Sequence, residues 1–108
     1  MDNVKYVEKL DNGSICLYSY ELSFRSQVIL SMDTLRWFAD FLDSKEENAY
    51  RNAEGDEYKA SRNFSSGNVT LEETRGGEGN GIPAEVAFSP REIPKVSADI
   101  KNIMKCPQ

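Results

Sequence analysis

The feature that most constrains the fold is a stretch that occurs twice in the chain. Residues 28–42 read as the end of a strand, a polar cap and an amphipathic helix, and residues 86–100 repeat this plan 58 positions later. The matching residues are Val28 and Val86, Ser31 and Ser89, Leu35 and Ile93, Phe38 and Val96, and Leu42 and Ile100. A strand that leads into a helix, present twice, predicts two copies of one unit.

Short strands precede each predicted helix. They span residues 3–10, 14–24, 28–30, 57–64, 69–74 and 84–88. Asn12-Gly13 is a strong hairpin signal because both residues tolerate positive φ, and Gly67 lies in a second predicted turn, with its surroundings matching those of Gly13. The predicted fold class is α+β: an antiparallel sheet with two helices on one side, built from two strand-strand-strand-helix repeats.

A charged segment, residues 45–56, separates the two units. We expect it to extend the first helix, with Gly55 just past its end, and a plain linker is the alternative. A chain of 108 residues is expected to form one domain, residues 1–108. Within it, the internal repeat comprises residues 3–44 and 57–105.

Polar residues mark the start of each predicted helix. Either Ser31 or Asp33 can cap the first helix by accepting a backbone N–H bond. For the second helix, Ser89 is suited to the N-cap and Glu92 to the third helical position. Pro94 lacks an N–H, so the second helix begins either at Ser89, irregularly, or only at Pro94.

The sequence lacks the residue patterns that are typical of catalytic and metal-binding sites. The chain has no histidine, which excludes Ser-His-Asp and Cys-His catalysis and removes the commonest metal ligand. Cys16 and Cys106 do not form a CxxC motif; Cys16 is expected to be a small buried hydrophobe and Cys106 to be free. We therefore expect a protein that is not an enzyme and needs no cofactor or metal.

The length of the apolar runs bears on location. The longest run is only a few residues, too short to cross a bilayer. The first residues contain no apolar core of a signal peptide, so the expected location is the cytoplasm.

Aromatic and basic residues are interleaved on the predicted strands. Aromatic rings can stack on bases and basic side chains can pair with phosphates. The candidate nucleic-acid-binding residues are Lys5, Tyr6, Lys9, Tyr18, Tyr20, Arg25, Lys59, Arg62, Phe64 and Arg75. The alternative is structural, since strands favour Tyr and Phe for packing and charges decorate the opposite face.

One stretch resembles a known family. Val28-Ile29-Leu30-Ser31, leading into an acidic-capped helix with Trp37, is similar to the positive-cofactor-4 family of single-stranded-DNA-binding transcriptional coactivators, and residues 86–92 repeat the pattern. The resemblance covers about a third of the chain. It implies a curved sheet, a pseudo-dimer within one chain and single-stranded DNA as the ligand. Here each unit has three predicted strands where the family has four, and the lysine-rich β-ribbons are missing.

Two functions follow as expectations. The first is a non-enzymatic protein that binds single-stranded nucleic acid on the sheet face. The rival is a small acidic protein-binding inhibitor or adaptor, of the immunity or anti-defence type, that occludes a basic protein partner; the net charge of −5 favours it. Trp37 and Phe41 widen the apolar arc of the first helix, so we expect them at a protein interface, including a homo-oligomer formed through the helices.

Overall fold

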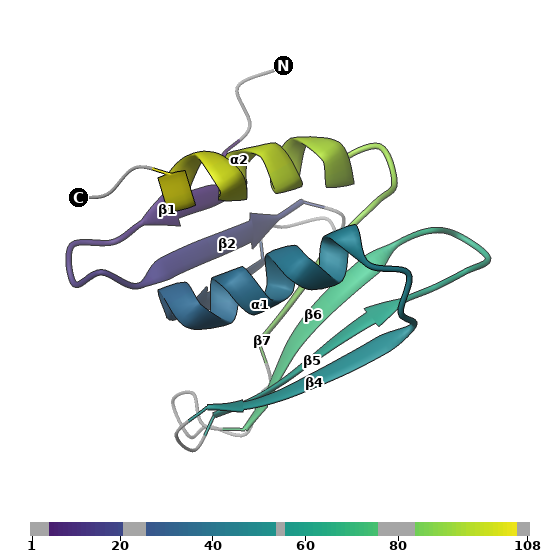
Figure 1. The fold of residues 1–108 in the computed structure, drawn as a ribbon, viewed down its shortest axis with the longest axis horizontal. Coiled ribbons are helices and arrows are strands. Elements are labelled where there is room, and N and C mark those ends of the chain that lie inside the picture. The colour runs from purple at the N-terminus through teal and green to yellow at the C-terminus, as the bar shows by residue number, and fades with distance from the viewer. Residues whose placement is uncertain (1–4, 21–25, 54–55, 76–83, 106–108) are drawn as a thin grey trace.

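The computed structural model describes residues 5–20, 26–53, 56–75 and 84–105 and confirms the α+β class (Figure 1). The elements in chain order are β1 (Val7–Lys9), β2 (Ile15–Ser19), β3 (Ser26–Leu30), α1 (Met32–Asp43), β4 (Asn48–Ala53), β5 (Asp56–Arg62), β6 (Val69–Arg75), β7 (Ala84–Phe88) and α2 (Ile93–Lys105). No helix in these ranges is long and apolar enough to cross a membrane.

The strands form two antiparallel sheets where the sequence predicted one. The first has the order β1-β2-β3 and the second the order β4-β5-β6-β7. The sheets meet where β3 contacts β7, and the two helices contact each other (Figure 1). Helix α2 also contacts β1, in the three-stranded sheet. Helix α1 contacts β4, in the four-stranded sheet, so the pair of helices bridges the two sheets.

One hydrophobic core joins both halves of the chain. Its buried members come from both sheets and both helices, and they include Ile15, Leu17, Val28, Phe38, Val69, Leu71, Val86, Phe88, Val96 and Ile100. Several of these occupy matching positions in the two repeats. Because the buried residues of both halves pack in one cluster, neither half has a complete core by itself. Burial of this apolar area is the main source of stability.

Strand β2 is covered on both faces. All five of its residues are buried. Ile15 and Leu17 belong to the shared core, whereas Cys16 lies on the other side of the strand. The predicted continuation of this strand over residues 21–24 lies outside the described residues.

The prediction that the first helix continues past Ser44 and ends before Gly55 is wrong. Helix α1 ends at Asp43, because Ser44 is extended and both its N–H and its hydroxyl donate to the Phe41 carbonyl, at 3.0 and 2.8 Å. Strand β4 follows and pairs with β5. Ala49 packs against the core and the Arg51 Nε donates to Thr34 Oγ1 at 2.9 Å, so alternate residues of β4 face inward. The second half therefore has four strands, not three.

Ser31 caps α1 as predicted, whereas Ser89 is not directly at the start of α2. Ser31 is the N-cap of α1, and its Oγ accepts from the Thr34 N–H at 3.2 Å. In the second half, the Ser89 N–H donates to Glu92 Oε1 at 2.9 Å across a turn, and α2 begins after that turn, at Ile93. Pro94 therefore lies in the first helical turn, where an N–H has no helical acceptor to lose.

Substitution of two turn glycines tests how much each turn contributes to the stability of the fold. Gly67 has a φ of +83°, and an added Cβ would lie 2.7 Å from Pro90 Cγ; Gly13 has a φ of +90° with open space around it. We expect Gly67→Ala to lower the free energy of unfolding by about 2 kcal/mol and Gly13→Ala by about 1 kcal/mol, because only the first adds a steric clash to the backbone strain. Urea unfolding measures both, and equal losses would contradict the role of the Pro90 contact.

Candidate nucleic-acid interface

The four-stranded sheet has one face that the helices do not cover. Tyr58, Ala60, Leu71 and Val86 point into the core, so the residues that alternate with them point away from it. We call this side the outer face. Its members, none of them buried, are Asn48, Tyr50, Asn52, Glu57, Lys59, Ser61, Thr70, Glu72, Glu85 and Ala87.

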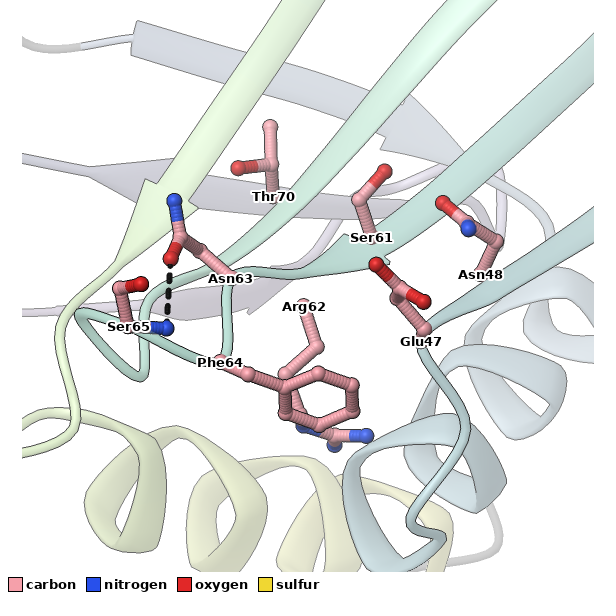
Figure 2. A pocket seen from close by; sticks show the side chains of 8 residues that line it. All are labelled: Glu47, Asn48, Ser61, Arg62, Asn63, Phe64, Ser65 and Thr70. Carbon is pink, nitrogen blue, oxygen red and sulfur yellow. Dashed lines mark hydrogen bonds between the residues drawn. The ribbon is translucent and has the colours of Figure 1, made fainter.

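A shallow depression lies at one end of the outer face. It has a volume of about 500 Å³ and is lined by side chains from β4, β5, β6 and the connections around them (Figure 2). The lining residues are Glu47, Asn48, Ser61, Arg62, Asn63, Phe64, Ser65 and Thr70. We refer to it as the polar depression, because Phe64 is its single aromatic member.

The turn after β5 presents Phe64 to solvent. Asn63 Oδ1 accepts from the N–H groups of Ser65 and Ser66, at 2.8 and 3.1 Å, and the Asn63 carbonyl accepts from the Gly67 N–H at 2.6 Å. These bonds hold the turn in one conformation. The Phe64 side chain is 65% exposed as a result.

Arg62 is committed to the fold. Its Nη1 donates to the Glu46 carbonyl at 2.6 Å, and its Nη2 donates to the Phe41 and Leu42 carbonyls at 3.0 and 3.4 Å. The guanidinium carbon lies 4.6 Å from the centroid of the Phe41 ring. The cation thus caps the C-terminus of α1, where the helix dipole favours a positive charge, and is not free to bind a phosphate.

The edge strand β4 carries a second exposed aromatic ring on the outer face. Tyr50 is 70% exposed, and Lys59 Nζ lies 5.8 Å from its ring centroid. The register places Glu72 next to Lys59 and Glu85 next to Glu72. The charge of this face is therefore mixed, neither continuously positive nor uniformly negative.

The structure brings together only some of the predicted nucleic-acid-binding residues. Lys59 lies on the outer face, and Arg62 and Phe64 line the polar depression. Arg25 lies outside the described residues, and the side chain of Arg75, at the end of β6, is also outside them.

The other predicted binding residues lie on or next to the three-stranded sheet. Tyr6 is buried and its hydroxyl donates to Glu92 Oε2 at 3.0 Å. The Tyr20 hydroxyl donates to the Lys5 carbonyl at 2.6 Å, and Tyr20 packs edge-on against Tyr6. These rings are engaged in packing and hydrogen bonds within the chain.

Tyr18 and the two N-terminal lysines complete this set. Tyr18 is buried, and its hydroxyl donates to Glu8 Oε1 at 2.6 Å, a bond that raises the pKa of the tyrosine well above its usual range. Lys5 is exposed, with its Nζ 3.8 Å from Glu8 Oε2, and Lys9 is exposed at the end of β1. None of these side chains faces the polar depression.

The two residues expected at a protein interface differ in burial. Phe41 is only 3% exposed and belongs to the core, under the Arg62 guanidinium. Trp37 is partly buried against the same core. Of the two, only Trp37 has surface to offer a partner.

Sequence reasoning missed Glu47, Asn48 and Tyr50. All three fall in the segment expected to be helical. The signal that was present is an alternation of period two, in which Asn48, Tyr50 and Asn52 alternate with small or inward-facing residues. Within the described parts of the chain, no group of acidic or cysteine residues gathers in a way that could hold a metal ion.

Comparison with known proteins identifies the fold alone. No family model matches the chain, and no curated protein matches it. Among solved structures, it is similar to the crystal structures of MRP1/MRP2 from Trypanosoma brucei. That match has a TM-score of 0.63 and 15% sequence identity, and it covers 91% of this chain and 70% of the other.

The first prediction from this geometry concerns Arg62. We expect Arg62→Ala to lower the free energy of unfolding by about 2 to 4 kcal/mol, because three carbonyls lose a charged donor. Arg62→Lys should restore only part of the loss, since an ammonium cannot reproduce the planar fork. Arg36→Ala is the control: its pair with Asp33 is exposed and should contribute about 0 to 0.5 kcal/mol. Urea unfolding that gives equal losses for Arg62→Ala and Arg36→Ala would contradict the capping role.

The second prediction concerns alkaline stability. Burial, followed by the hydrogen bond to Glu92, raises the pKa of Tyr6 from 10.0 to about 12, and burial, followed by the charge of Glu73, raises the pKa of Tyr58 to about 12. A folded-state pKa above the unfolded value stabilises the fold below pH 10, and this contribution disappears as the pH rises through about 12. We therefore expect the unfolding free energy to fall across this window.

Tyr6→Phe provides the test, because phenylalanine cannot ionise. The unfolding free energy of each protein is compared with its own value at neutral pH, which removes the effect of the lost Glu92 bond. As the pH rises, the unfolding free energy of Tyr6→Phe should fall less steeply than that of the wild type. Parallel curves for the two proteins would show that the ionisation of Tyr6 is not linked to unfolding.

Proposed function

We propose that the chain is a non-enzymatic protein that binds single-stranded nucleic acid on the outer face of its four-stranded sheet. The observation that carries the proposal is the exposure of two aromatic side chains. Tyr50, on the outer face, is 70% exposed, and Phe64, on the turn after β5 at one end of that face, is 65% exposed. Both rings are accessible from solvent and can serve as stacking surfaces for bases. The resemblance to the positive-cofactor-4 family supports the same class of ligand.

The spacing of the outer face suits successive bases. Each stacked base contributes about 1 to 3 kcal/mol, and stacking tolerates any base. Tyr50 is two residues from Asn48 on the same strand, which corresponds to about 7 Å along the sheet. That distance is close to the separation of adjacent nucleotides in an extended strand, so a base on Tyr50 can have its neighbour at the polar depression.

The charge of the surface defines the binding mode. Lys59 is the basic residue among the described members of the outer face, and Glu57, Glu72 and Glu85 share the face with it. The bases therefore face the sheet and most phosphates face solvent. For single strands the slope of log K against log salt is about −0.7 for each phosphate neutralised, so we expect a shallow slope of about −1.

The three glutamates also favour a second candidate function. They provide acceptors for a basic protein partner, as expected of a small acidic inhibitor or adaptor. In that case basic proteins should bind the outer face, and oligonucleotides should not bind at low salt, where phosphate contacts are strongest.

Fluorescence anisotropy with a labelled oligonucleotide of about 12 nucleotides tests the proposal. Tyr50→Ala and Phe64→Ala should each weaken binding by about 5- to 100-fold, because each removes a stacking platform. Ile29→Ala is the matched control: this side chain is also exposed, at 46%, but it lies on the three-stranded sheet, and its loss should leave affinity unchanged. An absence of binding at low salt, or wild-type affinity in both aromatic variants, would refute the proposal.

A further inference from the structure

The polar depression presents hydrogen-bonding groups that the fold does not use. Within the described parts of the chain, the carboxylate of Glu47, the amide of Asn48 and the hydroxyls of Ser61 and Thr70 form no hydrogen bond or ion pair. These residues come from the start of β4, from β5 and from β6, and they line one surface (Figure 2). Four uncommitted polar side chains on one concave surface indicate a site for a ligand with several donors and acceptors.

The same surface has a wall on which a flat ring can stack. Phe64 is 65% exposed, and the Asn63 side chain fixes the turn that carries it. The Asn63 amide uses its oxygen for this turn, which leaves its NH2 group as a donor. A volume of about 500 Å³ is within the range of small-ligand sites and is sufficient for one nucleoside.

The Glu47 carboxylate determines which ring fits best. It accepts hydrogen bonds and donates none, and its charge disfavours a phosphate at this position. Among the common bases, guanine alone offers two adjacent donors on one edge, N1–H and the N2 amino group. Adenine and cytosine each offer one amino group, and thymine and uracil offer one ring N–H. The O6 and N7 acceptors of guanine can be met by donors such as the Asn48 amide and the hydroxyls.

We infer that the polar depression is a guanine-binding subsite, in which Glu47 accepts from N1–H and the N2 amino group while the base stacks on Phe64. The inference rests on the proposed function and adds a base preference to it. The main chain of the site is held in place by Arg62, whose N–H donates to the Glu47 carbonyl at 2.8 Å and whose Nη1 donates to the Glu46 carbonyl at 2.6 Å. The carboxylate is therefore presented from a fixed backbone.

The experiment compares three labelled oligonucleotides of equal length: one of thymidine alone, one with several guanosines, and one with inosines in place of those guanosines. Inosine lacks only the N2 amino group, so it removes one of the two bonds to the carboxylate. We expect wild-type protein to bind the guanosine oligonucleotide about tenfold more tightly than the inosine one, the effect of one hydrogen bond to a charged group.

Glu47→Gln should abolish this difference. The ratio of the guanosine and inosine affinities is compared within each protein, so that a general change in affinity for single strands cancels. The side chain is exposed and makes no contact that the fold needs, so the variant should remain folded. Glu72→Gln is the matched control, a glutamate of the outer face that does not line the depression, and it should retain the preference.

The outcomes separate this inference from the function on which it rests. Equal affinity for guanosine and inosine oligonucleotides, or a preference that persists in Glu47→Gln, would overturn the guanine subsite while single-strand binding stands. No binding of any oligonucleotide, thymidine included, would overturn both.

Discussion

At the end of β5, the Arg62 guanidinium donates to carbonyls at the end of α1 and at Glu46, and its face packs on the Phe41 ring. The positive charge is favoured there because the last carbonyls of a helix lack partners and carry a partial negative charge. The main-chain N–H of the same residue binds the Glu47 carbonyl. The end of the helix, the connection and the first residues of β4 are thus fixed together. This one side chain sets where the outer face begins and how the polar depression is shaped.

Features that depend on local chemistry could be predicted from the sequence. The strand that leads into α1, the cap at Ser31 and the burial of Phe38 all follow from period and residue type within a few positions. Strand β4 was missed, because its residues are polar and charged and follow a helix, and its alternation of period two is a weak signal beside these. What makes residues 48–53 a strand is pairing with β5, which is a tertiary contact, and the inward bond from Arg51 to Thr34. Tertiary pairing outweighed local propensity here.

The residues of the candidate site also depend on tertiary contacts that the local sequence does not reveal. Residue type indicated that aromatic rings would lie on strands, but a tyrosine on a strand is equally suited to core packing. Tyr6 and Tyr18 are buried and hydrogen-bonded to carboxylates, whereas Phe64 points to solvent because its turn is fixed by Asn63. Tyr50, the most exposed large hydrophobic residue described, lies in the strand that sequence reasoning did not find. Exposure is decided by which face the helices cover, and that is a property of the assembled sheets.

We propose that single-stranded nucleic acid binds on the face of the four-stranded sheet that the helices leave open. Amide chemical-shift mapping by NMR, with unlabelled oligonucleotide titrated into labelled protein at low salt, tests that claim most directly. We expect the largest shifts on the outer face and at the polar depression, at Asn48, Tyr50, Lys59, Ser61, Phe64 and Thr70. Shifts concentrated on α1 and α2, or no shifts at all, would contradict it.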